Sequence, residues 1–308
     1  MKMSSSIYSS KILLFGEYSI ILNSFGFAIP YPLYNGRLKL NAANNDKDSN
    51  KNILEFIEYL KINGKNLSLD WLKINKDIAN GLFFKSNIPQ GYGLGSSGAL
   101  VAAFYNRYAK KKISLNEKLT KNKLQKLKNI FSKMESHFHG ESSGIDPLNC
   151  YLGLPILIKS QNEIEITKMP EEKATGSRGI FILDSGNSSD TSLMVSLFFK
   201  KMEDKNFNYM IKNQFIKYSK TCINEFLHGN IDSMFNSIKV LSEITLNNFQ
   251  PMIPNKFIKL WREGLITNDY FFKLCGSGGG GFLLGFTLDI NNTFKKLKDY
   301  KKEIIYKF

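Results

Sequence analysis

Cysteine is scarce in this 308-residue chain, and long apolar runs are missing from it. The three cysteines, Cys150, Cys222 and Cys275, are odd in number and widely spaced, so they support neither a disulfide framework nor a four-ligand zinc site. No stretch approaches the roughly 20 apolar residues that cross a membrane. We therefore expect a soluble protein with reduced thiols and no membrane partner.

A secretory signal is also missing. The short apolar run at residues 12–15 is interrupted by Gly16 and Glu17 before the apolar core of such a signal could form. Together with the scarce cysteines, this pattern predicts a cytoplasmic protein. Hydrophobic residues nevertheless make up 43% of the chain and aromatic residues 13%, which excludes a disordered chain and allows two globular domains.

Acidic residues are few relative to basic ones. The 42 Lys and Arg exceed the 27 Asp and Glu by 15, and such a surplus attracts phosphates, acidic metabolites, nucleic acids or anionic lipids without choosing among them. The surplus is densest at residues 107–133, where Glu117 is the single acid. We interpret this region as a solvated helical face. Aromatic residues do not alternate with its lysines, so it does not favour RNA binding.

The first half of the chain mixes predicted strands and helices. Short apolar segments at residues 11–15 and 81–89 are bounded by turn residues and predict strands. Apolar residues from Ile53 to Leu60 recur at helical spacing and predict a helix. The polar stretch at residues 41–51 predicts a surface loop.

A second pattern of strands and helices begins near Gly179. It starts with a strand at residues 179–184, continues with long helices through Leu260, and ends with two strand-like segments. No repeat and no Gly- or Pro-rich linker divides the chain. We therefore predict an α+β protein with one domain at residues 1–175 and another at residues 176–308.

A glycine-rich segment, GYGLGSSGA at residues 91–99, lies between a predicted strand and an apolar helix. Glycines let backbone amides approach an anion closely, and the start of a helix favours negative charge. The segment is not a Walker P-loop, because no lysine follows its last glycine. The residues alone leave two interpretations open. One is a phosphate loop whose Ser96 or Ser97 caps the helix or binds a phosphate-held magnesium ion, and the other is a flexible turn with a serine cap.

The string PQGYGLGSSGA at residues 89–99 resembles the second motif of the GHMP kinases, the family that includes galactokinase, homoserine kinase and mevalonate kinase. The string KLCGSGGGGFLLGF at residues 273–286 is similar to the third motif of this family, with Cys275 in place of the usual hydroxyl residue. Four successive glycines alone would equally indicate a hairpin turn or a bulge. The order of the two strings along the chain favours a resemblance to this family over an isolated turn or bulge.

The string KILLFGEYSII at residues 11–21 resembles the first motif, with Lys11, Gly16 and Glu17 in register. Tyr18 stands where mevalonate kinases usually have histidine. This departure concerns the substrate pocket that the resemblance implies, so the identity of the substrate is less constrained than the class of enzyme.

Two acidic residues, Glu135 and Asp146, lie between the second and third motifs. Phosphoryl transfer needs a positioned hydroxyl group, a magnesium ion and cations near the developing charge, and two carboxylates suit a metal ligand and a base. Asp146 precedes Pro147, which predicts a helix start. From the residues alone, Asp146 is either a helix cap or a base.

Two neighbouring groups of polar residues also need an interpretation. The H-x-H pair of His137 and His139 has no third metal ligand, and we interpret both residues as structural. The polar cluster that contains Thr191 follows the strand at residues 179–184 and either touches a substrate or caps the next helix.

The string HGESSGID at residues 139–146 resembles the H-G-x-P-S-G-x-D string of mevalonate kinases, with Ser142 in place of proline. The resemblance implies an N-terminal α+β domain like domain 2 of ribosomal protein S5 and a C-terminal ferredoxin-like domain, with the active site between them. It also implies ATP-dependent phosphorylation of the primary alcohol of a small metabolite, such as mevalonate to 5-phosphomevalonate in isoprenoid precursor synthesis. ATP and Mg²⁺ are the implied cofactors.

The same resemblance implies roles for individual residues. Asp146 would be the catalytic base, with Lys11 keeping it ionised, and Ser97 and Glu135 would bind the metal. The implied ATP-binding residues are Gly91, Gly93, Leu94, Gly95, Ser96, Ser97 and Gly98, and the implied substrate-binding residues are Glu17, Tyr18, Ser143, Gly144, Thr191, Gly278 and Gly279.

Two alternatives stay open. Another GHMP kinase would phosphorylate a different alcohol, such as phosphomevalonate, homoserine or a sugar. A non-catalytic RNA- or anion-binding protein is the second alternative, but it would not require Lys11, Glu135 and Asp146 together. We expect small-molecule partners and no nucleic acid, and a homodimer is left open.

Overall fold

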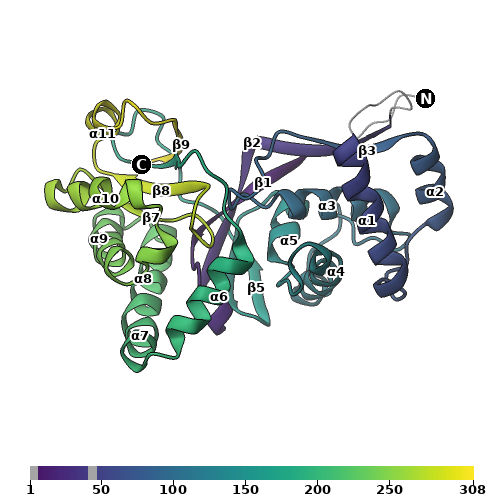
Figure 1. The fold of residues 1–308 in the computed structure, drawn as a ribbon, viewed down its shortest axis with the longest axis horizontal. Coiled ribbons are helices and arrows are strands. Elements are labelled where there is room, and N and C mark those ends of the chain that lie inside the picture. Colours follow the sequence, from purple (N-terminus) through teal and green to yellow (C-terminus); the bar gives the residue numbers. More distant parts are fainter. Residues whose placement is uncertain (1–5, 41–46) are drawn as a thin grey trace.

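The chain forms two antiparallel sheets in the computed structural model (Figure 1). The structure describes residues 6–40 and 47–308. The first sheet contains β1 (Tyr8–Phe15), β2 (Gly26–Leu40), β3 (Leu82–Ser86), β4 (Ile156–Ser160) and β5 (Glu163–Ile166). The second contains β6 (Gly179–Asp184), β7 (Tyr270–Leu274), β8 (Phe282–Thr287) and β9 (Lys302–Lys307). The predicted boundary at residues 175 and 176 lies in the connection between β5 and β6.

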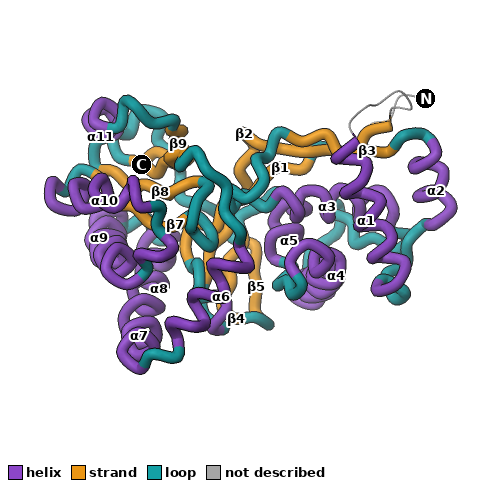
Figure 2. Tube along the Cα trace, viewed as in Figure 1, coloured by secondary structure: helices purple, strands orange, loops and turns teal. Residues whose placement is uncertain are grey.

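Helices gather at the two ends of the molecule, and β1 and β2 run between them (Figures 1 and 2). One group consists of α1 (Lys47–Asn63), α2 (Trp71–Ala79), α3 (Ser96–Tyr108), α4 (Lys121–His139) and α5 (Ile145–Leu152). The other consists of α6 (Thr191–Met202), α7 (Lys205–Met210), α8 (Ile216–Leu227), α9 (Ile231–Asn248), α10 (Asn255–Thr267) and α11 (Ile290–Lys296). None of the helices in the described residues is long and apolar enough to cross a membrane.

The first sheet is organised around the 15-residue strand β2. Its start pairs with β4, its middle with β1, and its end with β3. The β1 strand is almost entirely buried, because α3 and α5 pack near it and α8 from the second half of the chain also contacts it. The strands predicted at residues 11–15 and 81–89 and the helix predicted from Ile53 to Leu60 are therefore confirmed.

The second sheet has the strand order β7-β8-β6-β9, with all neighbours antiparallel. Along the chain, β6 is followed by helices, then by β7 and β8, then by α11 and β9. This β-α-β-β-α-β arrangement is the ferredoxin-like motif, here with several helices between its first two strands. The predicted α+β class and the ferredoxin-like second half are confirmed.

Two expectations about surface segments need correction. The predicted loop at residues 41–51 is wrong from Lys47 onward, where α1 begins, and residues 41–46 lie outside the described part of the chain. Polar and acidic residues are common at helix starts, so a polar stretch does not by itself exclude a first helical turn. The basic region at residues 107–133 is exposed at most of its lysines, but only part of it is the predicted helical face, because residues 109–120 connect α3 to α4.

A buried ion pair joins the two sheets. The Nζ atom of Lys273, on β7, lies 2.6 Å from Oε1 of Glu17, which follows β1, and both side chains are buried. Lys273 also donates a hydrogen bond to the carbonyl of Leu274. Burial raises the pKa of Glu17, and the charge of Lys273 opposes this rise. Removing one partner would leave an uncompensated charge in the interior.

We expect Lys273→Met to lower the free energy of unfolding by about 3–5 kcal/mol, because it leaves Glu17 buried without a partner. Lys61→Met serves as the control, because the exposed Lys61–Glu58 pair contributes about 1 kcal/mol or less. The double variant Glu17→Met/Lys273→Met should recover most of the loss. Urea unfolding of the four proteins checks this, and equal effects of Lys273→Met and Lys61→Met would contradict it.

Candidate active site

A cavity of about 2490 Å³ lies between the two halves of the molecule and is lined by residues from both. Its walls come from the end of β3 and the glycine-rich segment after it, from α4, from the starts of α5 and α6, and from the loop between β7 and β8. The cavity exceeds the roughly 300–1,000 Å³ of a typical small-molecule site. It therefore has room for two substrates at once.

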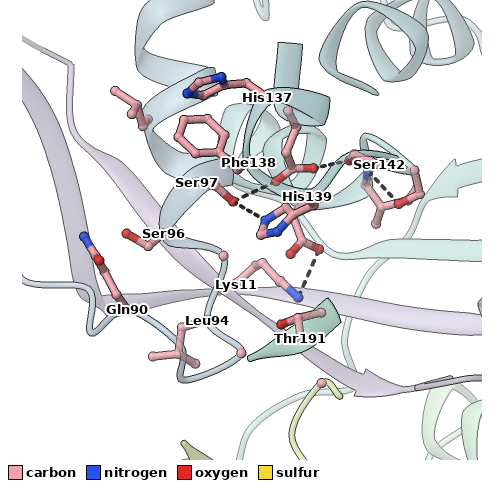
Figure 3. Close-up of a pocket in the computed structure, with 18 of the residues that line it drawn as sticks. Lys11, Gln90, Leu94, Ser96, Ser97, His137, Phe138, His139, Ser142 and Thr191 are labelled. Atoms are coloured by element: carbon pink, nitrogen blue, oxygen red, sulfur yellow. Dashed lines mark hydrogen bonds and ion pairs between the residues drawn. The ribbon is translucent and has the colours of Figure 1, made fainter. Parts of the chain in front are cut away.

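An ion pair between Lys11 and Asp146 lies in this cavity (Figure 3). Lys11 comes from β1, and its Nζ atom is 3.0 Å from Oδ1 of Asp146. Asp146 lies in the first turn of α5, as the sequence predicts, and its side chain is about one third exposed. A cation thus lies beside a carboxylate that still faces the cavity.

The electrostatics of this pair favour the charged form of Lys11. Burial disfavours the Lys11 ammonium, but the charge and the hydrogen bond of Asp146 outweigh that penalty and raise the pKa of Lys11. The backbone N–H of Lys11 donates to the carbonyl of Leu94, which attaches the glycine-rich loop to β1. The same residue therefore holds both the loop and the carboxylate.

A second group of polar side chains lies next to this pair (Figure 3). The hydroxyl of Ser97 donates to Oε1 of Glu135 over 3.1 Å, and the hydroxyl of Ser142 donates to Oε2 of the same carboxylate. Nε2 of His139 lies 3.1 Å from the Ser97 oxygen. Burial, followed by the charge of Asp146, raises the pKa of Glu135 to about 8. Glu135 therefore takes up a proton more readily than an exposed glutamate does.

Glycine allows the loops around the cavity to approach one another closely. A Cβ atom on Gly93, which has a φ of +76°, would lie 2.6 Å from the carbonyl oxygen of Cys275 in the loop between β7 and β8. A Cβ atom on Gly98 would lie 2.8 Å from the backbone of Asp146, so α3 and α5 pack together at this residue. The two glycine-rich strings, about 180 residues apart in the chain, thus meet at one wall of the cavity.

The predicted serine cap of α3 is wrong. The N-cap residue is Gly95, which has a left-handed conformation, and no side chain caps the helix. Ser97 directs its hydroxyl toward Glu135 instead. A polar partner across the cavity competes with the local backbone for a serine hydroxyl, and here that partner is Glu135, the residue that the family resemblance pairs with Ser97 as a metal ligand.

Most of the predicted site residues line the cavity, although some do not. The lining includes the predicted catalytic and metal-binding residues Lys11, Asp146 and Glu135. It also includes six of the seven predicted ATP-binding residues, and only Gly98 is outside it. Of the predicted substrate-binding residues, Ser143 and Thr191 line the cavity, whereas Glu17, Tyr18, Gly144, Gly278 and Gly279 are outside its lining.

The cavity residues that were not predicted as functional include His139, Ser142 and Lys128. His139 contacts Ser97, Ser142 contacts Glu135, and Lys128 projects from α4 and donates to the carbonyl of Gln161. A sequence signal did exist, because Lys128, Glu135 and His139 are spaced by seven and four residues and therefore share one helical face. This spacing was not recognised, because Lys128 was interpreted as part of the solvated basic face at residues 107–133.

Comparison with known proteins identifies the class of fold. Residues 53–153 match the family described as GHMP kinases N terminal domain. No curated protein matches the chain. The family match covers α1 to α5 and includes the glycine-rich loop, Glu135 and Asp146.

Solved structures of this class resemble nearly the whole chain. The structure of L. major mevalonate kinase in complex with R-mevalonate has a TM-score of 0.67 at 15% identity, covering 99% of this chain and 97% of that one. Methanococcus jannaschii mevalonate kinase has a TM-score of 0.64 at 17% identity, covering 100% and 99%. Streptococcus pneumoniae phosphomevalonate kinase in complex with phosphomevalonate and AMPPNP has a TM-score of 0.64 at 14% identity, covering 98% and 100%. The chain has the GHMP kinase fold, and the predicted resemblance to this family, and to mevalonate kinase within it, is confirmed.

The contact between the two glycine-rich loops can be tested with Gly93→Ala. The variant should lose about 1–2 kcal/mol from left-handed strain and about 1–3 kcal/mol more from the collision with Cys275. Gly153→Ala is the matched control, because Gly153 is also left-handed but a Cβ there meets nothing within 4 Å. Urea unfolding measures both, and equal losses would show that the loops do not depend on this contact.

Proposed function

We propose that this protein is a small-molecule kinase that transfers a phosphoryl group from ATP to the alcohol of a small metabolite. The observation that supports this proposal best is the Lys11–Asp146 ion pair beside the Ser97–Glu135 pair, in a cavity walled by two glycine-rich loops. Phosphoryl transfer depends on positioning and charge, and these residues supply a base, a cation and metal ligands.

Asp146 would act as the base. Its carboxylate would accept the proton of the alcohol, whose oxygen attacks the terminal phosphorus of ATP while ADP leaves. Lys11 would hold the Asp146 carboxylate in place and would offset the negative charge that develops on the transferring phosphoryl group. Because the Lys11 ammonium is buried and fixed by its partner, its contribution requires no rearrangement during the reaction.

Ser97 and Glu135 fit a magnesium ion. Their oxygens lie 3.1 Å apart and face the same cavity, and a hydroxyl and a carboxylate are oxygen ligands of the kind that Mg²⁺ prefers. The described residues contain no cluster of three or more His, Cys, Asp or Glu side chains for a metal, so phosphate oxygens and water would complete the shell. When bound, the ion would neutralise charge on the ATP phosphates.

The glycine-rich loop at residues 91–98 would hold the ATP phosphates. Its backbone is shaped by the left-handed residues Gly91, Gly93 and Gly95, and it leads directly into the N-terminus of α3. Such a loop and helix start present backbone N–H groups to an anion. Ser96 and Leu94 line the same part of the cavity.

We propose mevalonate as the alcohol. The motif that ends in Asp146 resembles that of mevalonate kinases, and two relatives of similar fold are mevalonate kinases. Ser143 and Thr191 line the cavity and could bind this substrate. A phosphomevalonate kinase is almost as similar in fold, which makes phosphomevalonate the second candidate.

We expect Asp146→Asn to lower kcat by about 10²–10⁴-fold, because general-base catalysis contributes about this much. A coupled assay of ADP release, with mevalonate, phosphomevalonate, homoserine and galactose, measures the rate and the substrate preference. The double variant Lys11→Met/Asp146→Asn removes the buried charge left by the single change and should be equally inactive. Full activity of either variant would contradict the proposed role of Asp146.

Magnesium binding should depend on the proton of Glu135. Because the pKa of Glu135 is raised to about 8, Mg²⁺ must displace a proton below that pH, and affinity should fall about tenfold from pH 9 to pH 7. Titration calorimetry of Mg²⁺ into the ADP-saturated protein measures this, after correction for Mg²⁺ binding to free ADP. Glu135→Gln should remove the dependence of Mg²⁺ affinity on pH. Glu141→Gln, which changes an exposed glutamate of the same cavity, should retain it.

A further inference from the structure

Tyr18 is buried in an unusual backbone conformation. It follows Glu17 after β1 and has a φ of 62°, in the left-handed region that non-glycine residues rarely adopt. Its ring stacks on Phe198 of α6 at 4.4 Å between centroids and contacts Phe249 at 5.5 Å. Only 3% of the residue is exposed. The surrounding contacts therefore hold Tyr18 in a strained conformation, and such strain often accompanies function.

The hydroxyl of Tyr18 reaches the other half of the molecule. It donates a hydrogen bond of 2.6 Å to the carbonyl oxygen of Ser277, in the loop between β7 and β8. Burial raises the pKa of Tyr18, so the phenol stays protonated and remains a donor at any ordinary pH. Because the peptide group is planar and trans, this bond also sets the direction of the Gly278 N–H, which points away from Tyr18.

The loop that receives this hydrogen bond is held at its far end by backbone hydrogen bonds, because the Gly279 N–H donates to the Met252 carbonyl and the Gly281 N–H donates to the Asn187 carbonyl. Its glycines Gly276, Gly278, Gly279 and Gly281 all have positive φ values, and glycine carries little intrinsic preference for one conformation. Yet the loop lines the cavity at Gly276 and Ser277, and the Ser277 hydroxyl lies 3.5 Å from that of Thr191. The Tyr18 hydrogen bond holds the cavity end of this loop, at Ser277.

We propose that Tyr18 is a positioning residue, which holds the loop at residues 276–281 in the shape that the reaction requires without touching either substrate. The inference rests on the proposed kinase function. The Tyr18 hydrogen bond fixes Ser277, and the loop meets the glycine-rich loop at Cys275 and Gly93. Loss of the hydroxyl would therefore displace two cavity walls at once.

Tyr18→Phe removes the hydroxyl and keeps the stacked ring. Tyr306→Phe is the matched control, because the Tyr306 hydroxyl is part of a buried residue and donates to the Pro170 carbonyl, also over 2.6 Å, outside the cavity lining. We expect kcat to fall about tenfold in Tyr18→Phe, with little change in KM for ATP, and neither value to change in Tyr306→Phe. The two variants should have similar Tm values, because each loses one hydrogen bond of the same type.

Hydrogen exchange at residues 276–281 tests the anchoring without any assay of activity. We expect exchange in this loop to be about three- to tenfold faster in Tyr18→Phe than in the wild type or in Tyr306→Phe. Unchanged exchange and unchanged kcat would overturn the inference. If the wild type phosphorylates no alcohol, the proposed function fails, whereas faster exchange would still establish that Tyr18 anchors the loop.

Discussion

The ammonium group of Lys11 is buried, and the need to neutralise it fixes the arrangement of the cavity floor. Asp146 meets this need, which places the first turn of α5 beside β1. Gly98 lets α3 approach the same turn, and α3 brings Ser97 to Glu135. A charge in the interior is costly unless it is paired, so the position of one ammonium group determines where three elements meet.

Contacts at the ends of β1, β3 and β7 join the two halves of the chain, together with the packing of Phe15 and Phe27 on Phe226 of α8. Glu17 pairs with Lys273, the Tyr18 hydroxyl binds the Ser277 carbonyl, and Gly93 allows close contact with Cys275. These three contacts act on backbone segments with little conformational preference of their own. The cavity therefore depends on tertiary contacts for its shape, although the residues that line it come from short local motifs.

Much of the fold and site could be predicted from the sequence. The apolar segments in β1 and β6 and the glycine-rich string before α3 have strong local preferences, and the motifs placed Lys11, Glu135 and Asp146 in one site. The position of Tyr18 could not be predicted, because its ring packs on Phe198 and Phe249, which are distant in the chain. His139 was missed because its partner, Ser97, is 42 residues away along the chain.

The sequence by itself determined which residues the motifs bring to the proposed site and which segments form strands, helices and glycine-rich loops, since these depend on residue type and short spacing. Only the tertiary structure decided which of the motif residues face the cavity. Ser97 faces Glu135 instead of capping α3, and Glu17 faces Lys273 instead of the cavity. The reason is that burial and charge pairing depend on partners distant in the chain, and these partners outweigh the local preference of each side chain.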